Sequence, residues 1–467
     1  MMTFINGFEK GEPDYLLAID VPTKLFKAKF EKNEDDNFVL KFENSTDETL
    51  NAEYFFKMPA VLRAPGFMDI ILMNSDAISF SQSLGDPQEI KVVYKSFSTE
   101  ADPSLWAKSK HCAYFKYSKK DFRFTHFALQ FEVTTHKDRY KSWKNAIALK
   151  ASPQSDILVS FDESLPGDDA YCIFRSQKAM EYATFERYIE AVKTTIGILG
   201  GYYFGDRAYF LSDYSKNPPK DKTPLIIRYR NTGKAIMHKY PLLDANHYHD
   251  VEPDQLMMKA DQFKKLTELL VENDDYLRAL KLLIDAASID GTSRGAIAAV
   301  ALESIANNLN EKGPALFIIK DKQIASQLRY ELGKALKVVK PRISKEDYKR
   351  IESKVGSVNV QPNAVKLESC FEKLGIILSE EEAFCISCRN YFLHGGLPKN
   401  KDLSFLTKDE LVFMVSQRLI MLSTMLLLKI AGYNGLVTDW GFTVVVKVRA
   451  IREGRPFLRQ GNAHRQV

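Results

Sequence analysis

The sequence predicts a mixed α+β protein, with a β-rich N-terminal region followed by an all-α C-terminal region. Short runs rich in Val, Ile, Phe and Tyr recur along the first half, and several alternate with polar residues, which is typical of strands. From about residue 254 the apolar spacing changes to i, i+3, i+4, which is typical of packed helices. At 467 residues the chain is long enough for two or three domains.

The strands expected in the first half are separated in many places by turn-forming residues. They fall at 14–21, 24–32, 37–44, 89–98, 111–118, 125–135, 145–152 and 156–161. Strands at this spacing predict an antiparallel sandwich or barrel. An amphipathic helix is expected at 185–201, and 202–214 should return to strand. We therefore predict a β-rich region over 1–245, and a subdomain break near 180 is an open alternative.

The helices expected in the second half are joined by short connections, which predicts a bundle. They fall at 254–273, 274–290, 293–313, 323–340, 344–356, 363–375, 380–394 and 408–431. This places a helical domain at 250–446. The last helix is the most apolar segment, but Gln417, Arg418 and Lys429 within it favour a core helix over a membrane span.

Composition and charge are those of an ordinary soluble protein, with 45% hydrophobic and 27% charged residues. The formal net charge of +5 resides in a basic tail at 447–467, where six Lys/Arg face only Glu453. Such a tail suits a polyanion or serves as a solubilising terminus. Five scattered cysteines and a start without a signal-peptide pattern predict a reducing cytoplasm.

One helix in the second half has unusually clear ends. Ser379 followed by Glu382 forms a capping-box pattern, which predicts the helix start. Gly395 and Gly396 permit the left-handed turn that stops a helix. The helix is therefore expected over about 380–394.

Three polar residues gather at the end of this helix. On an ideal helix Asn390 and His394 lie about 40° apart and share a face, whereas Arg389 projects about 140° away from His394. A site that uses all three side chains needs a tightened last turn or a second copy of the helix. A twofold dimer is the commonest way to bring identical residues together.

The hexapeptide Arg389–His394 resembles the R-N-x-x-x-H signature of the HEPN domain (higher eukaryotes and prokaryotes nucleotide-binding). Its setting agrees, because the motif ends a bundle helix, Gly-Gly follows, and a long apolar helix comes next. The layout resembles the Apea-like HEPN proteins of bacterial anti-phage defence. The resemblance covers about 255–435 by pattern and the N-terminal half by layout alone. It implies a metal-independent endoribonuclease that acts as a homodimer and needs no cofactor.

The resemblance also implies roles for the three residues. His394 would transfer protons, Arg389 would stabilise the phosphate, and Asn390 would position the reacting groups. Because the attacking group is the 2′-hydroxyl, RNA would be cut and DNA would not. The expected substrate is cellular tRNA or mRNA, cut during infection. The N-terminal region would be a sensing or regulatory module for a phage-derived trigger.

Glu303 is a candidate supporting residue. It is the only charge between Arg294 and Glu311 in an otherwise small and apolar helix. A partly buried carboxylate needs a partner, and Arg389 or His394 would serve. The alternative is that Glu303 faces solvent on the edge of its helix.

Two other functional classes stay open. The first is a non-catalytic HEPN module that binds a nucleotide, RNA or protein and dimerises. The second is a metal-dependent nuclease, for which the pairs Cys385/Cys388 and His247/His249 are the candidate ligands, with Cys370 as a further thiol. No metal is expected, since the Cys-x-x-Cys pair has no second pair near it in the sequence.

Overall fold

The chain divides into two compact units, Met1–Glu272 and Asn273–Val467, and it has the mixed α+β composition that the sequence predicts. The division lies later than the expected boundary at 245–250, because helix α5 (Ala260–Glu272) packs on helix α3 (Tyr182–Gly200) of the first unit. This computed structural model describes residues 15–19, 24–44, 60–63, 69–73, 76–82, 88–99, 102, 104, 106–122, 127–128, 130–134, 140–144, 146–152, 155–162, 167–205, 207–213, 225–231, 233, 235–243, 257–311, 318–359, 363–400, 402–442 and 458–460.

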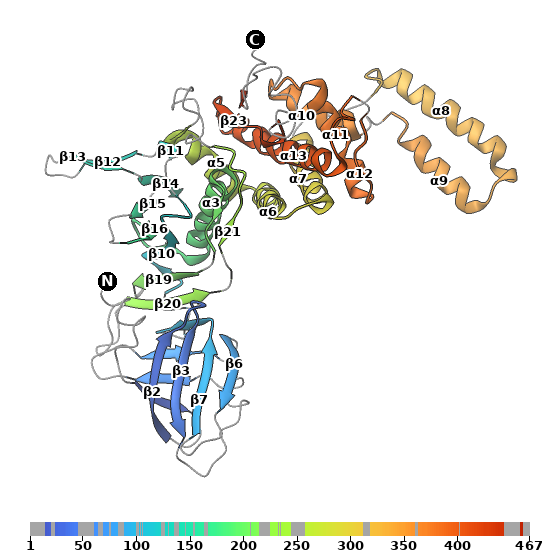
Figure 1. Cartoon of the computed structure of the whole chain (residues 1–467). Coiled ribbons are helices and arrows are strands. Elements are labelled where there is room, and N and C mark those ends of the chain that lie inside the picture. Colours follow the sequence, from blue (N-terminus) through green and yellow to red (C-terminus); the bar gives the residue numbers. More distant parts are fainter. Residues whose placement is uncertain are drawn as a thin grey trace. The chain divides into compact units, whose positions relative to one another are not determined.

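The first unit is built on a long antiparallel sheet (Figure 1). In sheet order, its strands are β14 (Ala146–Ser152), β15 (Ser155–Asp162), β16 (Asp169–Ser176), β10 (His111–Ser118), β19 (Arg207–Asp213), β20 (Leu225–Asn231), β8 (Ser96–Ser98), β5 (Ile70–Leu72), β4 (Ala60–Arg63), β1 (Tyr15–Ile19), β2 (Lys24–Lys32), β3 (Phe38–Asn44), β7 (Gln88–Tyr94) and β6 (Ala77–Gln82). Among the described strands the sheet is open, with β14 and β6 at its two edges, so the barrel, one of the two architectures expected, does not form there.

Short strand pairs complete the sheet structure of the described residues. They are β11 (Phe127–Ala128) with β22 (Met258–Lys259), β12 (Gln130–Thr134) with β13 (Tyr140–Lys144), β9 (Lys108–Ser109) with β17 (Met180–Glu181), β18 (Tyr202–Tyr203) with β21 (Ile236–Met237), and β23 (Leu436–Thr438) with β24 (Leu458–Gln460). Of these, β11 and β22 are parallel.

Aromatic packing and hydrogen bonds to the buried His111 stabilise the first unit. The rings of Phe30 and Phe38 stack at 4.9 Å, and Phe97 meets Phe38 edge-on at 5.0 Å. His111 lies between the hydroxyl of Ser212 at 2.8 Å and the carbonyl oxygen of Met180 at 3.0 Å. Burial lowers the pKa of His111 to about 4, so its ring is neutral near pH 7.

The second unit is helical. Its helices are α6 (Asp274–Ser288), α7 (Thr292–Glu311), α8 (Lys322–Val339), the 3-10 turn η4 (Lys340–Arg342), α9 (Lys345–Gly356), α10 (Asn363–Lys373), α11 (Glu380–Ser387), α12 (Arg389–Leu393) and α13 (Lys408–Ile430). Helix α7 lies at the centre and packs against α6, α10, α12 and α13. We call these central helices, together with α11, the bundle. In its core, small residues of α7, such as Ala298, pack with larger residues of α13, such as Leu419. Both of these side chains are fully buried.

Helices α8 and α9 form a hairpin that buries very little. Of the side chains in α8, only Ala325 and Leu336 are buried, and α9 and η4 bury none. The expected packed bundle is therefore present in α6, α7 and α10–α13 but does not extend to this pair (Figure 1).

Helix α13 is long and apolar enough to cross a membrane on length and composition alone. In the structure, 94% of its most apolar window is buried inside the protein. Arg418 within it pairs with Asp439 at 3.2 Å and with Glu381 at 2.7 Å. The charge is thus neutralised by acids of the same unit.

Candidate functional site

The polar helix end predicted at 380–394 is present, but the helix is broken. A turn at Cys388 separates α11 from α12. The amide of Tyr391 donates to the Cys388 carbonyl oxygen at 3.0 Å, an i to i−3 bond that tightens the last turn. The continuous helix was therefore wrong, because the chain changes to the tighter hydrogen-bond pattern there.

Both ends of the segment match their predicted caps. At the start, the Glu382 amide donates to the Ser379 hydroxyl at 3.2 Å, and the Ser379 amide donates to the Glu382 carboxylate at 2.8 Å. At the end, Gly395 adopts a left-handed φ of 72°. The Gly396 amide then donates to the Tyr391 carbonyl oxygen at 2.6 Å, which closes a Schellman turn. The capping box fixes the start of α11, and the Schellman turn fixes the end of α12 and places His394 there.

Arg389 points into the protein. Its side chain is 1% exposed, and its Nε donates to Oε1 of Glu303 on α7 at 2.9 Å. Glu303 is 35% exposed, so the ion pair lies at the edge of the core, with the arginine on the inside. The Nη1 of Arg389 is buried without a hydrogen-bond partner among the described residues. The guanidinium is therefore held by a carboxylate and is shielded from solvent.

Asn390 and His394 point outward. Both side chains are exposed, in agreement with the shared face expected from their spacing. Within one chain, then, the three polar residues do not gather around a single point. Two of them are available to a ligand at the surface, and Arg389 is not.

Phe392 anchors this short helix to α7, and sequence analysis missed its partner. The ring of Phe392 lies so close to Gly295 that a Cβ atom added there would be 2.6 Å from a ring carbon. Phe392 is buried, and it shares the inward face of α12 with Arg389. The signal in the sequence was a glycine inside a helix of small residues, which often marks such a close approach.

The thiols near the site are inert. Burial raises the pKa of Cys385 to about 12, and burial also raises that of Cys388 to about 12. Both therefore stay protonated near neutral pH, whereas a metal ligand or nucleophile must be a thiolate. Cys370 is buried too, and its Sγ lies 3.4 Å from the Lys366 carbonyl oxygen.

The described residues hold no group of three or more His, Cys, Asp or Glu side chains that could bind a metal ion. His247 and His249, the other candidate ligands, lie outside the described residues. So does most of the basic tail at 447–467, of which the structure describes only 458–460, in strand β24.

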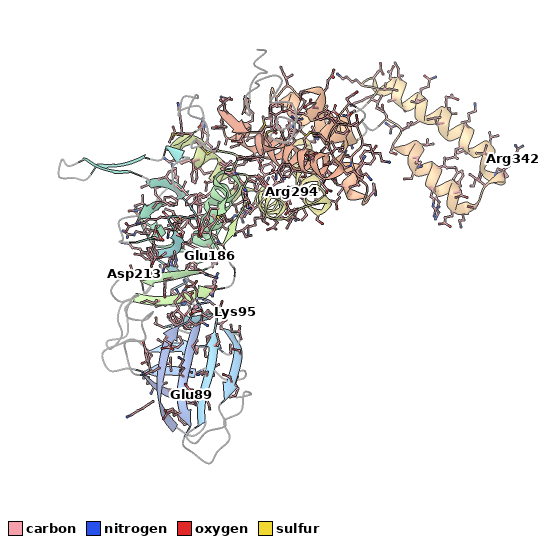
Figure 2. All side chains as sticks on the ribbon, in the orientation of Figure 1. Glu89, Lys95, Glu186, Asp213, Arg294 and Arg342 are labelled. Carbon is pink, nitrogen blue, oxygen red and sulfur yellow. The ribbon has the colours of Figure 1, made fainter. Side chains whose placement is uncertain are left out.

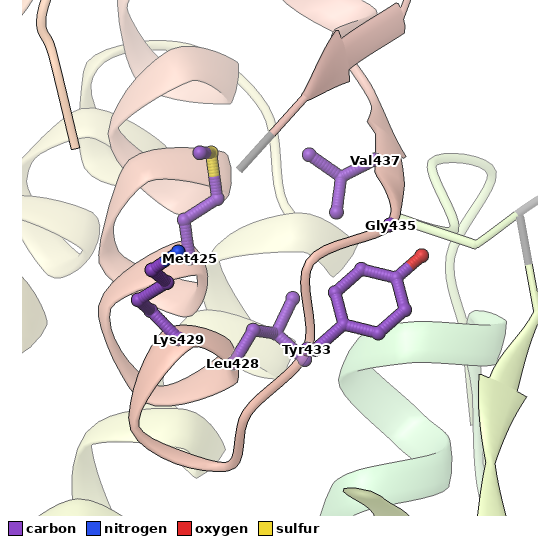
Figure 3. Close-up of a pocket in the computed structure, with 6 residues that line it drawn as sticks. All are labelled: Met425, Leu428, Lys429, Tyr433, Gly435 and Val437. Atoms are coloured by element: carbon purple, nitrogen blue, oxygen red, sulfur yellow. The ribbon is translucent and has the colours of Figure 1, made fainter. Parts of the chain in front are cut away.

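Neither of two pockets found among the described residues is lined by residues of the polar helix end. Figure 3 shows a small one beside the end of α13, lined by Met425, Leu428, Lys429, Tyr433, Gly435 and Val437. The centre of a water molecule can occupy about 10 Å³ of it, which is room for a single water. This pocket is too small for a substrate.

The larger pocket belongs to the first unit and has a volume of about 410 Å³, the size of a small-molecule site. Tyrosines and charged residues line it, among them Tyr114, Tyr117, Tyr202, Tyr209 and Tyr229. Its lysines are neutralised, since Lys32 pairs with Asp36 and Lys116 pairs with Asp169, each at 2.9 Å. None of the predicted site residues lines it.

No protein-family model, curated protein or solved structure matches this chain.

Proposed function

We propose that the protein is a metal-independent endoribonuclease of the HEPN type, with a site made by two copies of the chain. The observation that supports this most directly is the exposed pair Asn390 and His394 at a capped helix end, beside the buried Arg389–Glu303 pair. A histidine and an amide on one exposed face suit proton transfer and phosphate positioning.

The proposed reaction divides two proton transfers between the subunits. The neutral imidazole of one His394 takes the proton of the 2′-hydroxyl, and the 2′-oxygen attacks phosphorus. The protonated imidazole of the second subunit gives its proton to the leaving 5′-oxygen as the P–O5′ bond breaks. The products are a 2′,3′-cyclic phosphate and a 5′-hydroxyl. Asn390 would hold a phosphate oxygen or orient the imidazole.

The burial of Arg389 gives it a different role in this proposal from the one expected from the sequence. To touch a phosphate, the guanidinium would have to leave Glu303 and move to the surface, which would strand a partly buried carboxylate. We therefore assign Arg389 the role of positioning α12, so that His394 and Asn390 face outward together.

The biological setting follows from the HEPN resemblance. The proposal is a cytoplasmic homodimer that cuts tRNA or mRNA in anti-phage defence or abortive infection. The first unit would act as the sensing module for a phage-derived trigger, and its 410 Å³ polar pocket supports this part.

The test uses total RNA, the purified full-length chain and EDTA. We expect cleavage with 2′,3′-cyclic phosphate ends, and we expect His394→Ala to abolish it without lowering the unfolding temperature. Asn390→Ala, at the neighbouring exposed position, should reduce the rate by about 10²-fold. Tyr391→Ala, on an exposed side chain of the same helix, is the control. Full activity in the His394→Ala variant would remove the assignment.

A non-catalytic binding module is the second candidate, and the burial of Arg389 favours it. With the arginine held inside, the exposed part of the motif is smaller than the three-residue set expected for catalysis. Saturable RNA binding without cleavage, lost in Asn390→Ala and His394→Ala, would establish this alternative. Inhibition of cleavage by EDTA would instead indicate a metal-dependent nuclease.

A further inference from the structure

The hairpin at 320–356 carries the strongest charge excess in the described part of the second unit. It has eleven Lys/Arg against five Asp/Glu, a formal charge of +6, which exceeds the +5 of the whole chain. All eleven cationic side chains are exposed. Figure 2 shows side chains projecting along both helices, with Arg342 at the turn between them.

Few of these cations are neutralised. Within the described residues, the hairpin has one ion pair, between Arg350 and Glu346 at 2.7 Å, and Lys340 lies over the ring of Tyr348 at 5.1 Å. In the bundle, by contrast, the buried Arg389 and Arg418 both pair with carboxylates. Most cationic side chains of the hairpin therefore have no carboxylate partner among the described residues, and the positive potential around them attracts a polyanion.

One face of α8 combines charge with an aromatic ring. At about 100° per residue, Lys322, Lys337, Tyr330 and Lys334 fall within roughly 120° of arc. The three lysines span about 22 Å along the helix axis. Tyr330 lies among them and is 68% exposed. Lysines for phosphates and an aromatic ring for base stacking are the combination that binds single-stranded nucleic acid.

The opposite face of α8 is apolar but is a poor match for a lipid surface. Ile324, Leu328 and Val338 are exposed there, and on an ideal helix Glu331 falls between Val338 and Ile324. A carboxylate in the middle of the stripe would be carried into the lipid interface, where it is costly. The exposed cations also continue onto α9, where Ile351 is the only large apolar side chain that is exposed.

We propose that the hairpin 320–356 is an RNA-binding arm, in which Lys322, Lys334 and Lys337 contact the phosphate backbone and Tyr330 stacks on a base. This extends the proposed ribonuclease function by assigning where the RNA is held outside the reacting residues. The assignment of RNA as the polyanion rests on that function. The arm itself does not depend on catalysis, so the two can be tested separately.

The experiment measures binding of a labelled single-stranded RNA of mixed sequence by fluorescence anisotropy at several salt concentrations. The unmutated full-length chain is the parent throughout, and the RNA carries 2′-O-methyl groups, so that no 2′-hydroxyl is available for attack and the RNA is bound but not cut. The variant K322Q/K334Q/K337Q should bind at least tenfold more weakly. The slope of log K against log salt should become shallower by about 2, because each phosphate contact contributes about 0.7 for single strands.

Tyr330→Ala should weaken binding by about 5- to 100-fold and leave the salt slope unchanged, because stacking releases no counterions. The charge control is K108Q/K110Q/K178Q, which makes the same change in net charge at exposed lysines of the first unit. The face control is I324S/V338S on the apolar side of α8. Both controls should bind RNA as the parent does.

Several outcomes would overturn the arm. These are unchanged affinity and slope in the triple lysine variant, equal losses in the charge control, or loss only in I324S/V338S, which would indicate a protein partner on the apolar face. Preferential binding to anionic phosphatidylserine vesicles over RNA would indicate a membrane surface. Binding that depends on the arm, together with no cleavage of unmodified RNA by the unmutated chain, would support the arm and remove the nuclease. Cleavage of RNA together with binding that does not depend on the hairpin would support the nuclease and remove the arm.

Discussion

The bundle and the hairpin belong to the same unit and are both helical, yet the bundle helix α13 buries most of its side chains and the hairpin buries very few. Both α13 and α8 start with a capping side chain, Thr407 and Asp321 respectively. Helix α13 then buries almost every residue from Leu411 to Leu428, whereas α8 buries two. Local signals thus make a helix in either place, and only the partner surface decides whether its apolar face is covered.

The largest expected contrast comes from shortening an aliphatic side chain in each region. Leu419→Ala in α13 removes a fully buried side chain and should lower the free energy of unfolding by about 2–5 kcal/mol. Val338→Ala in α8, where the side chain is 73% exposed, should change it by less than about 0.5 kcal/mol. Hydrogen exchange of the bundle amides measures both. Similar losses would mean that the apolar face of the hairpin is covered in solution.

The next contrast removes one carboxylate charge from each region. Glu303→Gln leaves Arg389 buried with a weaker partner and should cost about 2 kcal/mol. Glu346→Gln removes an exposed i, i+4 pair with Arg350 and should cost less than about 0.5 kcal/mol. Urea unfolding monitored by a probe in the second unit checks both values. A negligible effect of Glu303→Gln would contradict the positioning role assigned to Arg389.

In the smallest contrast, the same Gly→Ala substitution is expected to lower the stability in one region and to raise it in the other. Gly295→Ala forces a methyl group against the Phe392 ring, and should cost about 1 kcal/mol after the gain in helix propensity. Gly333→Ala in α8 meets no atom within 4 Å and should stabilise by about 0.5–1 kcal/mol. Thermal unfolding of the two variants reports the difference. Partial recovery by adding Phe392→Leu to Gly295→Ala would locate the strain at that contact.

Much of the helical half could be predicted because its signals are local. The capping box at Ser379 and the left-handed Gly395 are formed by residues within a few positions of each other. The same periodicity predicted α8 and α9 as helices but suggested packing that they lack. An apolar stripe such as Ile324 and Leu328 has the same spacing whether or not a partner surface covers it.

The β-rich half was less predictable. Strands β4, β5, β6, β16 and β20 were not expected, although each pairs with neighbours in the long sheet. Strand β5 has three residues and is specified by its partners more than by its own pattern. Strand β16 is buried along most of its length and so shows little alternation.

The sequence could single out the residues of the candidate site, but it could not predict that Arg389 is buried while Asn390 and His394 are exposed. Helical spacing separated Arg389 from His394, and the isolated charge of Glu303 suggested a partner. What spacing does not contain is the contact between Phe392 and Gly295, which joins positions far apart in the chain. That contact fixes which side of α12 is buried.

The side chains of the motif at α12 point in opposite directions: Arg389 is buried, whereas Asn390 and the C-cap residue His394 are exposed. Mutations at these positions therefore test different properties of the protein. Asn390 and His394 support nothing inside the protein, so their replacement reports on ligands and chemistry alone. Arg389 is embedded in the interior, so its replacement disturbs folding together with any activity. An alanine survey that treats the motif as one unit would mistake a folding defect at Arg389 for a catalytic one, and the outward pair is where an inactive but intact protein should be sought.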